Sequence, residues 1–133
     1  MIAEAADFAS ECDATYALMK SVDDADFGRE TKFKGWTIND IMQHLYMGDI
    51  RAHMTLTDPE GYARIKAERQ SVVAATTAEK LANQREAAGH IEGKELLEAW
   101  RASAAKTAAA YAEADPKLRV QWAGPDMSAR SSI

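Results

Sequence analysis

The sequence predicts an all-α protein, and three observations support this fold class. Apolar residues recur every three or four positions, which is the spacing of one helix face. Only seven glycines and three prolines interrupt the 133 residues, so long stretches carry no helix breaker. The spacing is helical rather than the alternation typical of strands. We therefore predict one helical domain over residues 1–133, a length sufficient to bury a hydrophobic core.

The first predicted helix covers residues 3–22. Its apolar stripe consists of Phe8, Cys12, Thr15, Met19 and Val22. Acidic residues are unfavourable at a helix C-terminus, so the acidic run at residues 23–26 is predicted to form a turn. This turn leads to Phe27 and Gly28.

The second predicted helix covers residues 37–57. Thr37 can cap its first turn, and Asp40 lies where the helix dipole favours negative charge. Asp58 and Pro59 end it. At about 100° per residue, the predicted buried face consists of Ile38, Ile41, Leu45, Ala52 and Leu56.

A polar, alanine-rich segment follows at residues 62–88, with thin apolar content that includes Val72 and Val73. We predict a helical excursion outside the core. A third long helix is predicted over residues 94–114, ended by Asp115-Pro116. Its buried positions are Leu97, Trp100, Ala104, Thr107 or Ala108, and Tyr111.

The C-terminal segment contains a short extended run at residues 118–122 and a helix cap at Ser128. Three long amphipathic helices and the start of another predict a four-helix bundle. The fourth helix is expected to be largely missing, because the chain ends at Ile133. About 35 residues join the second and third helices, and this long crossover would let the two run parallel.

Composition excludes several classes of function. With 16 basic and 21 acidic residues and no basic run, a nucleic-acid partner is not expected, and charges along residues 64–69 suggest a solvated helix face. The N-terminus lacks signal-peptide features, and no apolar stretch approaches the ~20 residues of a membrane span, so we expect a cytoplasmic protein without membrane contact.

Cys12 stands alone beside two acids, which predicts a packed thiol. Neither a nucleophile elbow nor a glycine-rich phosphate loop is present.

His44 is the first candidate for a metal ligand. Gly48 lies one turn further along the same row and would leave space beside the imidazole. From spacing alone, a packed or hydrogen-bonded edge histidine is the preferred interpretation of His44, and a metal ligand is the alternative. His53 lies one turn after Asp49, where the two could form a surface pair or, alternatively, a pair of metal ligands. His90 lies between two glycines in a predicted loop.

The residues Gly35-Trp36-Thr37, with His44 eight positions after the tryptophan and then Asp49, resemble the second helix of mycothiol-dependent maleylpyruvate isomerase N-terminal domains. These domains belong to the DinB/YfiT-like metal-binding bundles. The acidic turn before Phe27 and the approach to a fourth helix at residues 122–130 extend the resemblance over nearly the whole chain.

This resemblance implies a divalent metal, usually zinc, held by a histidine of the second helix and a Glu-x-x-x-His pair of the fourth. The first ligand maps onto His44, and Asp49 is expected to support a ligand or line the site. No Glu-x-x-x-His pair occurs at the position of the fourth helix here. The implied cofactors are therefore the metal and a low-molecular-weight thiol such as mycothiol.

The implied activity of the complete protein is isomerisation or thiol transfer on a small electrophilic molecule. In such a site the metal would favour deprotonation of the thiol. The competing hypothesis is a non-enzymatic helical module that binds another chain or forms a homodimer through the uncovered groove of the fourth helix.

Overall fold

The computed structural model describes residues 1–72 and 76–133. Its elements in chain order are α1 (Glu4–Lys20), the 3₁₀ helix η1 (Asp24–Gly28), α2 (Ile38–Thr57), α3 (Pro59–Ser71), α4 (Thr77–Ala87), α5 (Gly93–Glu113), β1 (Arg119–Val120), β2 (Met127–Ser128) and α6 (Ala129–Ser132). The all-α prediction is confirmed. The three predicted long helices correspond to α1, α2 and α5, and the excursion consists of α3 and α4. Val73, predicted as part of that excursion, lies outside the described residues.

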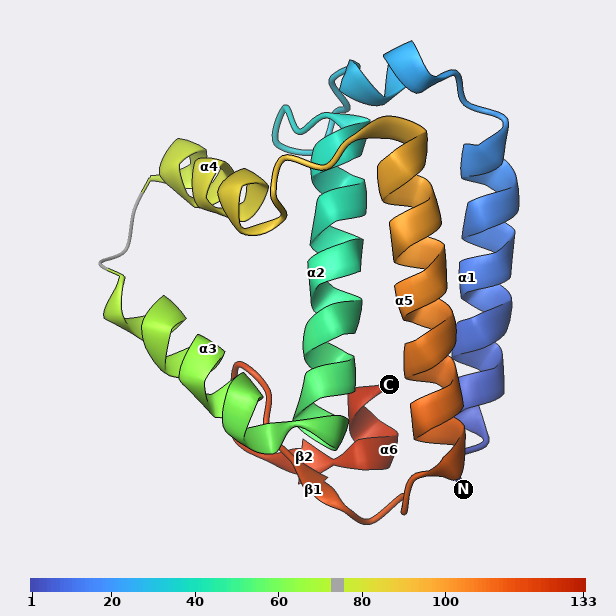
Figure 1. Ribbon diagram of the computed structural model, residues 1–133, viewed down its shortest axis with the longest axis vertical. Helices are drawn as coiled ribbons and strands as arrows, with labels where there is room; N and C mark the ends of the chain where they lie inside the picture. Colours follow the sequence, from blue (N-terminus) through green and yellow to red (C-terminus); the bar gives the residue numbers. More distant parts are fainter. Residues whose placement is uncertain (73–75) are drawn as a thin grey trace.

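The three long helices lie side by side, with α5 between α1 and α2 (Figure 1). The helices α2 and α5 run in the same direction and α1 runs in the opposite one. The segment between α2 and α5 places α3 and α4 on the side of α2 that faces away from α5. The parallel pair and its long crossover are thus as the sequence predicts.

Most of the core comes from α5. Its buried residues are Gly93, Leu96, Leu97, Trp100, Ala104, Thr107, Ala108 and Tyr111, which include every position predicted for this helix. One apolar cluster gathers around Trp100 and Phe27, and a second gathers around Tyr111 near the chain termini. The helix therefore carries a continuous buried stripe that holds α1 and α2 against it.

The start of α2 is as predicted, and its predicted buried face is right in part, since Ile38, Ala52 and Leu56 pack against the core clusters. Thr37 and Asp40 form a reciprocal capping box at the first turn. Of the predicted apolar stripe, Leu45 is 37% exposed, whereas Met42 is buried in its place. The remaining members of that stripe are only partly buried: Ile38, Ile41, Ala52 and Leu56.

Polar residues account for the difference between the predicted and the observed buried face of α2. Asn39 and Gln43 are buried, and each binds the backbone just before or at the start of α5. The Asn39 Oδ1 accepts a hydrogen bond from the Gly93 N–H at 2.8 Å, and the Gln43 Nε2 donates to the Ile91 carbonyl at 2.9 Å. A hydropathy pattern assigns these side chains to the surface, yet their hydrogen bonds satisfy backbone groups that would otherwise be buried without partners.

The chain after α5 forms a small cap over the end of the bundle. Strands β1 and β2 pair antiparallel, with Arg119 opposite Ser128 and Val120 opposite Met127. This pairing gives the predicted extended run a partner strand that the sequence did not indicate. Ser128 caps α6 as predicted, since its Oγ accepts a hydrogen bond from the Ser131 N–H. No helix in the described part of the chain is both long and apolar enough to span a membrane.

Candidate functional site

His44 lies exposed on α2, at the edge of a small aromatic group. Its ring centroid is 5.8 Å from that of Trp36, with an angle of 63° between the planes. Trp36 in turn contacts Phe33 edge to face, at 5.2 Å. The loop before α2 brings these rings together because Lys34 and Gly35 both adopt positive φ and turn the chain back. His44 therefore lies beside the ring of Trp36 and is itself exposed to solvent.

Gly48 provides the predicted space next to His44. A Cβ added there would meet no atom within 4 Å. The same row of α2 continues to Arg51, because seven residues rotate the helix by almost two full turns. His44, Gly48 and Arg51 thus share one side of α2, with about 10 Å of helix between the first and the last.

The described residues do not complete a metal site. No group of three His, Cys, Asp or Glu side chains in residues 1–72 and 76–133 is placed to hold an ion. His44 can supply one imidazole ligand, whereas a zinc site in an enzyme usually needs three protein ligands.

Asp49 lies away from His44. Five residues separate the two on α2, which places them about 140° apart around the helix. The Asp49 Oδ2 accepts a hydrogen bond from the Trp100 Nε1 of α5 at 2.8 Å. The structure thus directs Asp49 toward the α5 interface, and His44 toward solvent.

The predicted pair of Asp49 and His53 does not form. The His53 Nδ1 lies 3.2 Å from the hydroxyl of Thr57 instead. Asp49 uses its carboxylate for Trp100. His90 is exposed in the turn after α4, as its glycine neighbours predicted.

Burial sets the protonation of two groups in the bundle. It raises the pKa of Asp49 to about 6, although the hydrogen bond from Trp100 lowers that pKa in part. Burial, followed by the charges of Asp49, Asp13 and Glu11, raises the pKa of the Cys12 thiol to about 11. Cys12 therefore packs as a neutral thiol, in agreement with the sequence prediction.

We expect Asp49→Asn to stabilise the protein above pH 6. The folded state holds a proton on Asp49 up to about pH 6, whereas the unfolded chain releases it near pH 4, so the stability of the native protein falls between these values as pH rises. The shift corresponds to at most about 3 kcal/mol. Solvent screening of the exposed part reduces the expected gain to about 1–2 kcal/mol.

Urea denaturation at pH 4 and pH 7.5 tests this prediction. The gain from Asp49→Asn should appear at pH 7.5 and vanish near pH 4, because asparagine can still accept the hydrogen bond from Trp100. A gain of equal size at both pH values would show that ionisation of Asp49 is not its cause. Asp13→Asn on the exposed face of α1 is the matched control and should change stability by less than about 0.5 kcal/mol.

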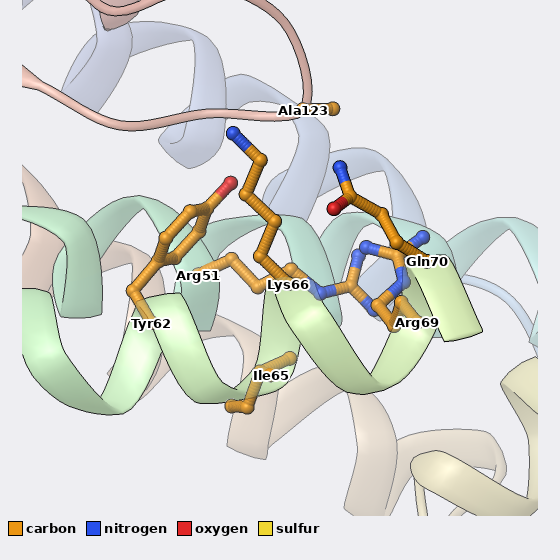
Figure 2. A pocket seen from close by; sticks show the side chains of 7 residues that line it. All are labelled: Arg51, Tyr62, Ile65, Lys66, Arg69, Gln70 and Ala123. Atoms are coloured by element: carbon orange, nitrogen blue, oxygen red, sulfur yellow. The ribbon is translucent and has the colours of Figure 1, made fainter.

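A cavity of about 230 Å³ that was not predicted from the sequence lies between α2 and α3. Figure 2 shows Arg51 of α2 reaching toward α3, from which Tyr62, Lys66 and Arg69 enter the same space. A signal for it exists in the sequence. Unlike Arg64, which has Glu60 and Glu68 one turn away on either side, these cations have no acid three or four residues away.

The fold is that of a DinB-like helical bundle: α2 and α5 run parallel, a long crossover joins them, and His44 lies on α2. Residues 8–133 match the family model described as the mycothiol maleylpyruvate isomerase N-terminal domain. The chain belongs to this family. No curated protein and no solved structure matches it significantly.

Proposed function

We propose that this chain is the bundle of a metal-dependent enzyme that uses a low-molecular-weight thiol, such as mycothiol, on a small electrophilic molecule. The reaction would be an isomerisation or a thiol transfer. The observation that carries the proposal is the position of His44, which is exposed on α2 and has open space beside it at Gly48. Membership of the mycothiol maleylpyruvate isomerase N-terminal family supports the thiol.

In this proposal His44 is one protein ligand of a divalent metal, with zinc as the first candidate. An imidazole nitrogen is a common zinc ligand, so an exposed histidine suits zinc. The remaining ligands would come from outside the described residues, either from further chain or from a second copy. When bound, the metal would favour the thiolate form of the thiol. We also propose a cytoplasmic location, where such thiols are kept reduced.

Zinc binding tests the proposal directly. The full-length protein is purified, loaded with zinc, desalted, and analysed for metal by mass spectrometry. We expect zinc to be retained, and His44→Ala to weaken its binding by about 100-fold or more, because even residues that only support a ligand contribute 10–100-fold. His53→Ala is the matched control: it removes a histidine from the same helix and should leave the zinc content unchanged.

Two results would contradict the assignment. Equal zinc content in the native protein and in His44→Ala would place the metal elsewhere. No zinc in the native protein would favour the second candidate, a non-enzymatic binding or dimerisation module. Sedimentation would then show whether that module forms a dimer.

A further inference from the structure

The cavity between α2 and α3 is cationic. Its charged side chains are Arg51 from α2 and Lys66 and Arg69 from α3, and none of the described residues that line it is acidic. Lys66 and Arg69 lie three residues apart and therefore share one face of α3. Ile65 forms an apolar part of the lining. Ala123, in the loop after β1, lines the cavity from the other side (Figure 2).

These three cations differ from four of the six other arginines of the protein. Arg29, Arg85, Arg101 and Arg130 each lie within ion-pair distance of a carboxylate. In the described part of the chain, no carboxylate pairs with Arg51, Lys66 or Arg69. The positive charge of the cavity is therefore not neutralised by the protein that surrounds it.

Of the three cations, Arg51 has the buried group without a hydrogen-bond partner in the described part of the chain. Its Nε is buried and has no hydrogen-bond partner among the residues that the structure describes. Burial lowers the pKa of its guanidinium, and the charge of Arg69 lowers it further. An arginine nevertheless remains charged in proteins. A buried donor without a partner, held next to a second cation, is costly unless an anion accepts from it.

We propose that this cavity binds a small oxyanion, namely the carboxylate or phosphate group of a small molecule. The planar guanidinium groups of Arg51 and Arg69 can each donate two parallel hydrogen bonds to such a group. Lys66 adds a point charge, and Tyr62 and Gln70 add neutral donors. At about 230 Å³ the cavity is smaller than the roughly 300–1,000 Å³ typical of larger ligands, which fits an anionic group and a short stem.

This site requires no metal, so its test is independent of the zinc proposal. Nitrogen-15 NMR spectra of the metal-free protein are recorded in bis-Tris with EDTA, while inorganic phosphate or succinate replaces sodium chloride at constant ionic strength. We expect saturable shifts of the Arg51 Nε–H and of the amides at residues 62–70. Saturation by phosphate alone identifies a phosphate site, and saturation by succinate alone identifies a carboxylate site.

Variants separate a built site from general charge attraction. Arg69→Gln and Lys66→Gln should each weaken binding roughly tenfold, because each removes a charge-assisted hydrogen bond. Arg64→Gln removes the same charge from an exposed position of the same helix and should change the affinity less than about twofold. Arg51→Met should abolish saturation. If that variant does not fold, the two α3 variants still decide the matter.

Two outcomes would overturn the proposal. Shifts that grow linearly with both anions and never saturate would indicate screening of surface charge only. An equal loss of affinity in Arg64→Gln and Arg69→Gln would show that net charge of α3, rather than the cavity, attracts the anion.

Discussion

Replacing Trp100 with alanine should destabilise the protein by about 4 kcal/mol, the largest effect we expect from a single substitution. Trp100 is 2% exposed and lies in the cluster that joins α5 to α1, α2 and η1. Truncation of a buried tryptophan removes apolar contact and leaves a cavity, at about 3–5 kcal/mol. It also leaves the partly buried carboxylate of Asp49 without its donor.

One further variant separates the loss of packing from the loss of the hydrogen bond, and a second serves as a control. Trp100→Phe keeps most of the apolar volume but loses the hydrogen bond to Asp49, so we expect about 1–2 kcal/mol. The pKa of Asp49 should then rise above about 6, since that hydrogen bond lowers it. Trp122→Ala, at a tryptophan that is 42% exposed, should have an effect of about 1 kcal/mol or less.

Urea denaturation followed by circular dichroism measures the three free energies of unfolding. A loss below about 1 kcal/mol in Trp100→Ala would contradict the central position of this residue. If Trp100→Phe were as costly as Trp100→Ala, the hydrogen bond to Asp49 would outweigh the packing of the ring.

The sequence predicted those parts of the fold in which burial follows hydropathy. In α5 every core position lies on one stripe, and small residues such as Ala104 and Ala108 continue it between Leu97 and Tyr111. The crossover was predictable for a different reason. Its length and polar composition leave too little apolar surface for a core helix, and α3 and α4 indeed lie to the side of α2.

The orientation of α2 could not be predicted, because its buried face is partly polar. Asn39 and Gln43 bind backbone groups 48 to 54 residues away in sequence. Nothing in the local pattern identifies such partners, since the hydrogen bonds exist only after the crossover has returned the chain to the bundle. Leu45 was assigned to the core for the same reason and lies partly exposed instead.

The candidate site was predicted unevenly. The space at Gly48 beside His44 follows from a glycine in a helix interior, and the structure contains it. The cationic cavity combines residues from two helices, and the two cations from α3 lie in sequence among the ordinary surface charges of residues 64–69. Only the absence of acids one turn away distinguishes Lys66 and Arg69 from Arg64, and recognising the cavity also requires knowing that α3 packs beside Arg51.

Asp40→Ala is expected to destabilise the protein by about 3 kcal/mol. Asp40 is 1% exposed and serves two helices at once. Its carboxylate accepts a hydrogen bond from the Thr37 N–H at 2.9 Å and completes the cap of α2. It also accepts two from Arg85 of α4, at 2.7 and 2.8 Å. Loss of a cap costs about 1 kcal/mol, and loss of a bidentate pair to a buried carboxylate adds about 2 kcal/mol once the exposure of Arg85 is allowed for.

This contribution should depend on pH. The hydrogen bonds from Arg85, followed by the cap at Thr37, lower the pKa of Asp40, although burial opposes them. The stabilisation is therefore present above pH 4, where the unfolded chain is also ionised, and is lost as pH falls toward the lowered pKa of the folded state. The difference in free energy of unfolding between the native protein and Asp40→Ala should accordingly shrink below pH 4.

Hydrogen exchange shows which helix is destabilised in Asp40→Ala. Amides of α4 should exchange faster in Asp40→Ala, because the variant loses the carboxylate that binds Arg85 and keeps only the backbone carbonyl at residue 40 that accepts from Gln84 to hold α4 near the start of α2. Glu4→Ala breaks an ion pair with Arg130 that is largely exposed to solvent, and should leave both the stability and the exchange of α4 nearly unchanged. Unchanged exchange in α4 would mean that the crossover is held by other contacts, and that Asp40 acts only as the cap of α2.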